Sequence, residues 1–581
     1  MFGNILEIVG NYVLVENASH ELKNSILNYH VIFPENDRGV VGEIVSINKD
    51  IIKIYLVGEI SGGTFKPGVM RKPSFSSIPR IVYKKELELL IGNQDLNNKD
   101  TFYLGKSLIY KDFNISVKYN DFFSNHFAIL GNSGSGKSCG VARILQNVFQ
   151  DNKNGIPENA HIAIFDVYGE YNSAFSNSNE IKNFGYKSYN TLDEGSHINI
   201  PAYLLDIDDL ALLLNVTNSS QLPILEKTLK LVYIFNSLDP NVEEYKNDII
   251  AECLLDILSS GRSSTQIRDQ LVAILTRYNT KDLNLETPIV QPGYTRTLKQ
   301  CLNIDAQGKM NALDLVISHL EQYKKLDLAS VSVSSSTMYN LDDLYYALDF
   351  ALISEGLLKS EKIYDEYNAL KVRLQQIINS DNRKFFDVGK ERIGKNEFVE
   401  KLFLSDKKCQ IINFNLNYVE ERFIKILTKI YARLFFEYTT NLKKRGSFPI
   451  HIILEEAHRY VQNDNDVNVL GYNIFDRITK EGRKYGLLIG LITQRPSELS
   501  TTALSQCANF IVFRIFHPLD INIISNITTN ANEETIEKVK NLLPGTAMVF
   551  GSSFKLPLIT KLDLPNPMPK STNVDIMNTW Y

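Results

Sequence analysis

A run of glycines and small polar residues ends in a lysine and a serine at Gly131–Ser138, read as Gly-Asn-Ser-Gly-Ser-Gly-Lys-Ser. This spacing fits G-x-x-x-x-G-K-[ST], in which backbone N–H groups turn inward around a phosphate and the lysine reaches the β- and γ-phosphates. The sequence therefore predicts a nucleotide-phosphate site with the Ser138 hydroxyl on Mg²⁺. Its expected lining is Gly131, Asn132, Ser133, Gly134, Ser135, Gly136, Lys137, Ser138 and Cys139.

Two adjacent acids follow the short apolar run His451–Leu454. A phosphate loop needs a carboxylate near Mg²⁺ and a base for the attacking water, so we expect Glu455 to support the metal and Glu456 to deprotonate the water. A solvated turn is the alternative reading of this pair. His458 has no companions at metal-ligand spacing, which favours a capping role, and no metal other than Mg²⁺ is predicted.

Three further side chains follow or precede apolar runs and could act on phosphate. Gln494 comes two residues after the run Leu487–Ile492 and is placed to sense the γ-phosphate or the water, although a turn-capping amide is the alternative. Arg483 and Arg514 are candidates for the positive charge that phosphoryl transfer requires, often supplied by a neighbouring subunit. Their alternative is a structural role, since cations in the last turn of a helix stabilise its dipole.

The elements that must position these residues follow from the apolar periodicity. Short alternating strands at 5–15, 40–47 and 51–57 predict a small closed barrel. Strand, loop and helix then alternate from about residue 127, which indicates a parallel sheet. Residues 200–400 are mainly helical, and the strand pattern returns near 410. The predicted strands are 127–130, 161–165, 410–414, 451–454, 487–492, 510–513 and 547–550, and the predicted helices include 137–149 and 420–438.

The composition is that of a globular protein. The 581 residues include 62 Lys+Arg and 67 Asp+Glu, a formal charge of -5 that excludes a basic nucleic-acid-coating protein. Five cysteines without a C-x-x-C pair argue against a disulfide framework or thiolate zinc site. No apolar run approaches the roughly 18 residues that cross a bilayer, and no signal peptide is recognised at the start, so we expect a cytoplasmic protein.

Five segments together resemble the HerA family of the HerA/FtsK hexameric ATPases. They are GNSGSGKS at Gly131–Ser138, FDVYGEY at Phe165–Tyr171, LEEAHRY at Leu454–Tyr460, KEGRKYG at Lys480–Gly486 and TQRPS at Thr493–Ser497. The segment from Leu504 to Arg514 is also similar to the family's ending. Glu455 departs from many P-loop enzymes, which carry Asp there, although HerA relatives also show Glu. The resemblance, which covers residues 1–175 and 405–560, adds Asp166 and Glu170 as support for the nucleotide site.

This resemblance implies an α/β fold: a P-loop NTPase core of RecA-like type with a mainly parallel sheet, a small N-terminal β-barrel and a helical insertion. The expected domains are a barrel at 1–90, the core at 91–200 and 405–560, the insertion at 201–404 and a tail at 561–581. It further implies a homohexamer that hydrolyses ATP with Mg²⁺ and draws double-stranded DNA through its channel with a partner nuclease. In a bacterial antiphage complex, the partner is instead an effector such as a sirtuin-like NADase.

Two alternatives remain open at the sequence level. A nucleotide-dependent scaffold that activates an effector needs the same pocket as a DNA motor, and a related secretion or conjugation ATPase is disfavoured by the absence of apolar spans. Basic clusters at Lys443–Arg445, Arg483–Lys484 and Arg71–Lys72 could contact DNA phosphates, although each is more often a solvated face. No base-reading module is recognised, so sequence-specific DNA binding is not predicted.

Overall fold

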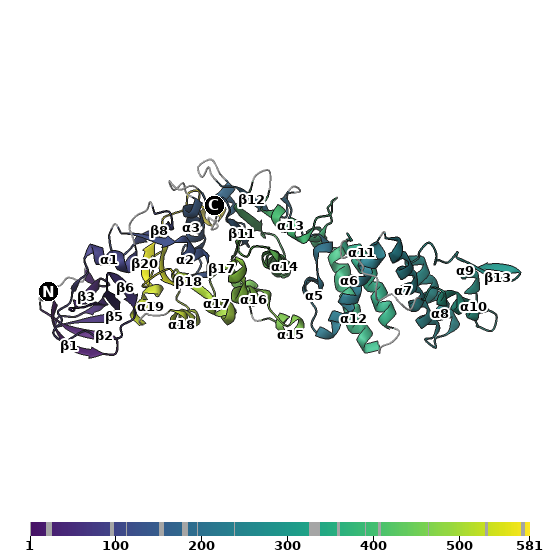
Figure 1. The fold of residues 1–581 in the computed structure, drawn as a ribbon, viewed down its shortest axis with the longest axis horizontal. Helices are drawn as coiled ribbons and strands as arrows, with labels where there is room; N and C mark the ends of the chain where they lie inside the picture. The colour runs from purple at the N-terminus through teal and green to yellow at the C-terminus, as the bar shows by residue number, and fades with distance from the viewer. Residues whose placement is uncertain are drawn as a thin grey trace. The chain divides into compact units, whose positions relative to one another are not determined.

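A computed structural model divides the chain into two compact units (Figure 1). Unit 1 comprises residues 1–198, 395–464 and 472–581, and unit 2 comprises residues 199–394 and 465–471. The structure describes residues 2–18, 26–92, 98–111, 113–149, 156–176, 184–193, 196–237, 239–324, 337–356, 361–389, 391–404, 408–462, 464–528, 533–570 and 576–580. Within these ranges, no helix combines the length and the apolar composition needed to cross a bilayer.

The N-terminal part of unit 1 is a sheet of seven strands with the order β1-β2-β5-β4-β3-β7, and β6 pairs with β5. Its strands are β1 (Phe2–Val9), β2 (Tyr12–Asn17), β3 (His30–Pro34), β4 (Gly39–Ile47), β5 (Ile51–Ser61), β6 (Thr64–Pro67) and β7 (Arg80–Ile81). The single strand predicted at 5–15 is wrong. Gly10, with a φ of +58°, turns the chain there, so the segment forms the hairpin β1–β2.

The predicted closure of this sheet is also corrected for the described residues. The ladder begins at β1 and ends at β7, and no pairing joins these two strands in the part of the chain that the structure describes. The alternation of β5 nevertheless buries one face, because Ile52, Ile54 and Leu56 pack against Val13 and Val40. The sheet therefore has an interior of its own without a closed ladder.

The second sheet of unit 1 has eleven strands in the order β12-β15-β11-β16-β17-β10-β18-β19-β20-β8-β9. The first seven of these strands are parallel to one another, and the rest are antiparallel. The strands are β8 (Thr101–Ser107), β9 (Asn114–Lys118), β10 (His126–Leu130), β11 (His161–Asp166), β12 (Tyr186–Tyr189), β15 (Ile411–Asn415), β16 (Ile450–Leu454), β17 (Leu487–Thr493), β18 (Cys507–Val512), β19 (Thr546–Gly551) and β20 (Leu558–Lys561).

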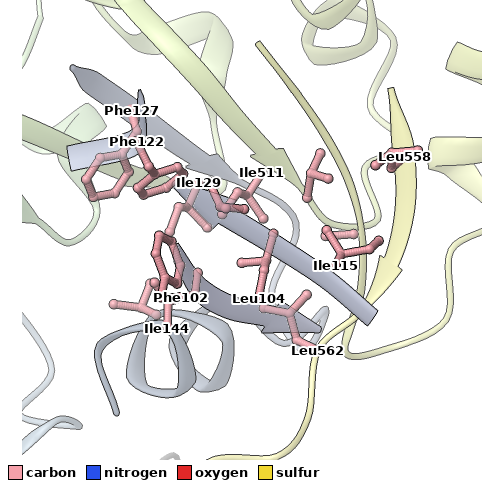
Figure 2. Close-up of a cluster of buried hydrophobic side chains, with 14 of the residues drawn as sticks. Phe102, Leu104, Ile115, Phe122, Phe127, Ile129, Ile144, Ile511, Leu558 and Leu562 are labelled. Carbon is pink, nitrogen blue, oxygen red and sulfur yellow. The ribbon is translucent and has the colours of Figure 1, made fainter. Parts of the chain in front are cut away.

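Both faces of the parallel part are covered, which explains why its strands read as continuous apolar runs. On β11, Ile162 and Ile164 belong to the core that includes helix α3, whereas the next residue, Phe165, contacts Tyr431 of α14. Successive side chains of a strand point to opposite faces. Figure 2 shows the core on the α3 side, where Ile144 lies near Phe102 and Leu104.

The helices of unit 1 connect or flank these strands. They are α1 (Lys84–Ile91), α2 (Tyr119–Phe123), α3 (Lys137–Phe149), α4 (Asn172–Ser176), α13 (Lys395–Leu402), α14 (Glu421–Asn441), α16 (Ile474–Glu481), α17 (Thr501–Ser505), α18 (Pro518–Ile527), α19 (Glu533–Lys540) and α20 (Ile576–Trp580). The alternation of parallel strands with helices confirms the predicted α/β class.

Unit 2 is a helical body in which α11 packs against α6 and α12, and α7 packs against α8 and α10. Its helices are α5 (Ile207–Leu213), α6 (Leu222–Asn236), α7 (Pro240–Leu258), α8 (Ser264–Arg277), α9 (Leu298–Cys301), α10 (Leu313–Glu321), α11 (Leu341–Gly356), α12 (Glu361–Ile378) and α15 (Asp466–Leu470). Sequence periodicity missed its hairpin β13 (Pro288–Gln291) and β14 (Tyr294–Thr297). It also missed that residues 465–471 belong to this unit.

Candidate nucleotide site

Five parallel strands of unit 1 end at one edge of the large sheet, which we call the carboxyl edge. The register pairs Leu130 of β10 with Thr493 of β17 and with Val512 of β18. It also pairs Phe165 of β11 with Leu454 of β16. The residues after these positions therefore gather along the carboxyl edge, where open α/β sheets bind their ligands. They include the glycine-rich loop, Asp166, Glu455, Glu456, Gln494 and Arg514.

The loop between β10 and α3 has the backbone that a phosphate cradle requires. Gly134 and Gly136 have φ values of +71° and +104°, a conformation that L side chains rarely adopt. A Cβ on Gly136 would also lie 2.9 Å from the backbone nitrogen of Gly545. Lys137 Nζ donates to the Asn132 carbonyl oxygen at 3.0 Å, which holds the lysine over its own loop. Burial lowers the pKa of Lys137, and the nearby charges of Glu456 and Glu455 oppose this shift.

An acidic cluster lies beside this loop. Glu455 is 4% exposed, and burial, with the charges of Asp166 and Glu170, raises its pKa well above its usual value. The Oε2 atoms of Glu455 and Glu170 are buried and lack a hydrogen-bond partner among the described residues. Such oxygens fit a cation. No set of three or more His, Cys, Asp or Glu side chains forms a metal site within the described ranges. Mg²⁺ would therefore also depend on Ser138 and on nucleotide phosphate oxygens, as it does in P-loop enzymes.

Asp166 has a structural role that the sequence did not define. Its Oδ1 accepts from the backbone N–H of Glu170 and its Oδ2 from that of Tyr171, each at 3.0 Å. Oδ2 also accepts from Asn413 Nδ2 at 3.1 Å. Asp166 therefore closes the turn that carries Glu170. Asn413 was missed, although a polar residue inside the apolar strand β15 is the signal that could have indicated it.

Removing the Asp166 carboxylate should destabilise unit 1. Asp166→Ala leaves two backbone N–H groups of a buried turn without an acceptor, at about 1–3 kcal/mol each, so we expect the free energy of unfolding to fall by about 2–4 kcal/mol. Chemical denaturation measures this change. Asp166→Asn keeps an acceptor oxygen and is the matched control, expected to lose less. Equal losses for the two variants would contradict the assigned hydrogen bonds.

A chain of polar contacts links the loop to the expected base. Ser133 Oγ donates to Gln494 Oε1 at 2.6 Å, and Gln494 Nε2 donates to Glu456 Oε1 at 3.2 Å. Glu456 has a left-handed backbone with a φ of +47°, an uncommon conformation for a residue with a side chain. Burial raises the pKa of its carboxyl, whereas the charges of Lys137 and Arg459 lower it. Glu456 and Gln494 are therefore in contact with each other at the edge of the phosphate loop.

His458 lies in the same network, although its sequence context predicted a capping role. Its Nδ1 is 2.9 Å from Thr493 Oγ1 and 3.3 Å from Glu456 Oε2. Burial lowers the pKa of His458, which favours the neutral ring. The sequence shows that His458 lies two residues after Glu456. Its contact with Thr493 depends on the pairing of β16 with β17 and could not be read from the sequence.

The two candidate arginines lie at opposite edges of the sheet. Arg514 follows β18, and its carbonyl accepts from the backbone N–H of Asn132 at 3.0 Å. Its Nε is buried without a partner in the described part of the chain, as an anion-binding group would be before its ligand arrives. Arg483 precedes β17, so the seven residues of that strand separate it from Gln494 by about 20 Å. Arg483 cannot serve the phosphate loop of its own chain.

The predicted tail at 561–581 returns to the nucleotide site in its described part. The backbone N–H of Lys570 donates to the Glu170 carbonyl at 2.8 Å. Ser173 Oγ donates to the Met568 carbonyl at 2.9 Å, and Gln146 Nε2 donates to that of Pro567 at 2.8 Å. Residues 566–570 therefore pack on α3 and α4. The proline-rich sequence of this segment did not predict its hydrogen bonds to Glu170, Ser173 and Gln146.

The glycine-rich loop between a parallel strand and a helix, with acids at the end of a neighbouring strand, defines a P-loop NTPase core. Comparison with known proteins shows what this chain is similar to. The family model of the central domain of helicase HerA matches residues 102–323. The DNA double-strand break repair helicase HerA of Pyrococcus furiosus is 22% identical over 96% of this chain and 85% of its own length. This chain is therefore similar to HerA helicases over most of its length.

A second similar protein and one solved structure are also matched. A probable DNA double-strand break repair helicase HerA of Methanocaldococcus jannaschii is 21% identical over 99% of this chain and 98% of its own length. The VirB4 structure of Thermoanaerobacter pseudethanolicus is 12% identical, covers 80% of this chain and 97% of its own, and has a TM-score of 0.45. The family match reaches residue 323, so it includes part of unit 2, whereas the motif resemblance covered residues 1–175 and 405–560.

Proposed function

We propose that this chain hydrolyses ATP in a ring of six copies and uses the energy to move along or unwind double-stranded DNA together with a partner nuclease or NADase effector. The observation that carries the ATPase assignment is the contact of Gln494 with both the phosphate-loop residue Ser133 and Glu456. The Gln494 amide would then contact both a phosphate group bound at the loop and a water beside Glu456. The names of the HerA relatives support the action on DNA.

The side chains divide the chemistry as follows. The loop N–H groups and Lys137 would hold the β- and γ-phosphates, and Arg514, whose Nε has no hydrogen-bond partner among the described residues, would join them. The Glu456 carboxylate accepts the proton of the attacking water, and the Gln494 amide orients that water. Bound Mg²⁺, held by Ser138 and supported by Glu455, would neutralise phosphate charge, while Asp166 and Glu170 support the metal side of the site.

The first test is phosphate release from ATP by the purified chain with Mg²⁺, with and without linear duplex DNA. We expect Lys137→Ala to reduce release at least about 100-fold, because the lysine contacts the transferred phosphate. Lys66→Ala, an exposed lysine of β6, is the matched control and should retain full activity. Native mass with and without ATP measures ring formation. A chain that stays a single subunit and releases no phosphate would contradict the proposal.

A second candidate is a nucleotide-dependent scaffold that activates an effector, with DNA movement secondary. The chain has 62 basic and 67 acidic residues. This slightly negative charge favours the scaffold, because most DNA affinity comes from basic residues that neutralise phosphates. The two candidates separate in a variant that binds ATP without hydrolysing it. Partner activation that survives in such a variant supports the scaffold, whereas activation that is lost together with DNA movement supports the motor.

A further inference from the structure

The turn at residues 542–545, which precedes β19, lies directly against the phosphate loop. The backbone N–H of Gly545 donates to the Ser135 carbonyl oxygen at 3.0 Å. A Cβ on Gly136 would lie 2.9 Å from the same Gly545 nitrogen, so the turn and the loop are in close contact. Ser135 and Gly136 immediately precede Lys137, where α3 begins. The turn therefore borders the end of the phosphate loop that leads into the helix.

This turn presents an apolar surface beside the loop. Leu543 is 67% exposed, and Pro544 after it is also exposed, whereas Leu542 is buried. A single exposed leucine is ordinary on a protein surface. Leu543 differs because it lies two residues before Gly545, which contacts the loop. The exposed apolar side chain is therefore held next to the expected ligand.

Several hydrogen-bonding groups of the turn already have partners. The Leu543 carbonyl accepts from the backbone N–H of Thr546 at 3.0 Å, and the Gly545 carbonyl accepts from that of Leu562 at 3.0 Å. The N–H of Gly545 is used in the contact with the loop. Pro544 has no N–H to donate. The turn therefore offers a neighbouring ligand mainly apolar contact.

The polar contacts of the loop set the expected direction of a bound triphosphate. Ser133 contacts Gln494, and Gln494 contacts Glu456, so the γ-phosphate is expected on the side of β17 and β16. The α- and β-phosphates lie along the backbone N–H groups of such a loop. In the sheet, β10 lies between β17 and β18, and β19 follows β18. The nucleoside is therefore expected on the side of β18 and β19, where the turn before β19 lies.

Two other exposed apolar side chains are found on this side, but they follow a strand that contacts the opposite end of the loop. Phe516 and Leu519 are each 61% exposed and follow Arg514. The Arg514 carbonyl accepts from the backbone N–H of Asn132, the second residue of the loop, at 3.0 Å. Leu543 instead belongs to the turn that borders the helix end of the loop, towards which the α-phosphate lies.

We propose that the base of the bound nucleotide packs on Leu543 and Pro544, so that apolar contact holds the base and distinguishes one purine from another only weakly. This inference deepens the proposed function and rests on its nucleotide site. Adenine and guanine offer nearly the same ring area to an apolar surface. A site that recognises its ligand by buried hydrogen bonds rejects the wrong one by about 10⁴-fold or more, whereas apolar contact discriminates by about 10–200-fold.

Binding of ADP and of pyrophosphate to the full chain with Mg²⁺, measured by titration calorimetry, tests this contact. Both ligands use the phosphate loop, but only ADP carries a base. Leu543→Ser should weaken ADP binding about tenfold, or about 1.4 kcal/mol, near the low end of what burial of a leucine side chain contributes. Pyrophosphate binding should not change. Leu543→Met keeps the apolar contact and should keep the ADP affinity, and GDP should bind within about 100-fold of ADP.

Two control variants replace exposed residues, so the fold should tolerate them. Leu192 is 76% exposed and follows β12, which five strand spacings of about 4.8 Å separate from β10. Leu192→Ser should therefore change neither affinity. Phe516→Ser tests the competing position after β18 and should also leave the ratio of ADP affinity to pyrophosphate affinity unchanged.

Three results would overturn the base contact. An equal loss of ADP and pyrophosphate binding in Leu543→Ser would assign the residue to support of the loop or to a contact between copies. A selective loss of ADP binding in Phe516→Ser, without one in Leu543→Ser, would place the base beside β18. GDP binding weaker than ADP binding by more than about 100-fold would contradict the weak discrimination.

The base contact and the proposed hydrolase can fail separately. A selective loss of ADP binding in Leu543→Ser, in a chain that releases no phosphate from ATP, would keep the base contact and refute the hydrolase. Phosphate release by the unaltered chain, together with an unchanged ADP affinity in Leu543→Ser, would keep the hydrolase and overturn the base contact.

Discussion

Glu456→Gln should bind ATP with nearly unchanged affinity and hydrolyse it about 10²–10⁴-fold more slowly, the range that general base catalysis contributes. Gln keeps the size of the side chain and an oxygen that can accept from Gln494, so the left-handed turn at Glu456 and its neighbours should persist. Only the ability to take a proton from water is lost. Binding of a fluorescent ATP analogue and single-turnover phosphate release measure the two properties separately.

The control for this prediction is Glu498→Gln, an exposed acid that pairs with Arg495 at 2.9 Å and should leave both properties unchanged. The pH profile adds a second readout. Burial raises the pKa of Glu456, so its carboxylate gains a proton at higher pH than an ordinary glutamate, whose pKa is near 4.3. The hydrolysis rate should therefore begin to decline on acidification at a pH above that value. A parallel loss of ATP affinity in Glu456→Gln would contradict the assigned role.

The sequence predicted the strands that carry the site because their patterns are strong. The helix predicted at 137–149 and the strands near 127–130, 161–165 and 451–454 match the structure to within one or two residues. Buried parallel strands are apolar on both faces, and a phosphate loop has a fixed spacing. In a parallel α/β sheet, the residues after the strands lie at one edge. The sequence could therefore predict that the phosphate loop, Glu456 and Gln494 lie at the same edge.

Contacts between residues far apart in the chain could not be predicted in this way. Ser133 meets Gln494 across 361 positions, and Asn413 meets Asp166 across 247. A serine in the loop and an amide in a strand have many possible partners, and only strand order and register select one. The prediction of a single strand at 5–15 was wrong for a different reason. Gly10-Asn11 lies inside a mainly apolar run, so the turn between β1 and β2 interrupts the pattern only briefly.

Arg483→Ala should reduce ATP hydrolysis by about 10³-fold or more, the effect of removing an arginine that stabilises transferred phosphate from a neighbouring subunit. Arg483 precedes β17, at the edge of the large sheet opposite its own phosphate loop, so only a neighbouring copy could bring this arginine to a nucleotide. The expected loss concerns hydrolysis, and ATP binding should change little. Lys484→Ala removes the adjacent exposed cation and is the matched control, expected to retain activity.

Mixing variants distinguishes a shared site from a structural role. In a mixed ring, an Arg483→Ala copy supplies an intact Glu456, and a Glu456→Gln copy beside it supplies an intact Arg483. Random mixing of equal amounts should then complete about a quarter of the contacts and restore activity in proportion, since each head-to-tail contact joins two different surfaces. If Arg483 only stabilised its own helix end, no mixture could recover activity, because every active site would still lack one of its groups. Recovery that depends on the mixing ratio is therefore the decisive measurement.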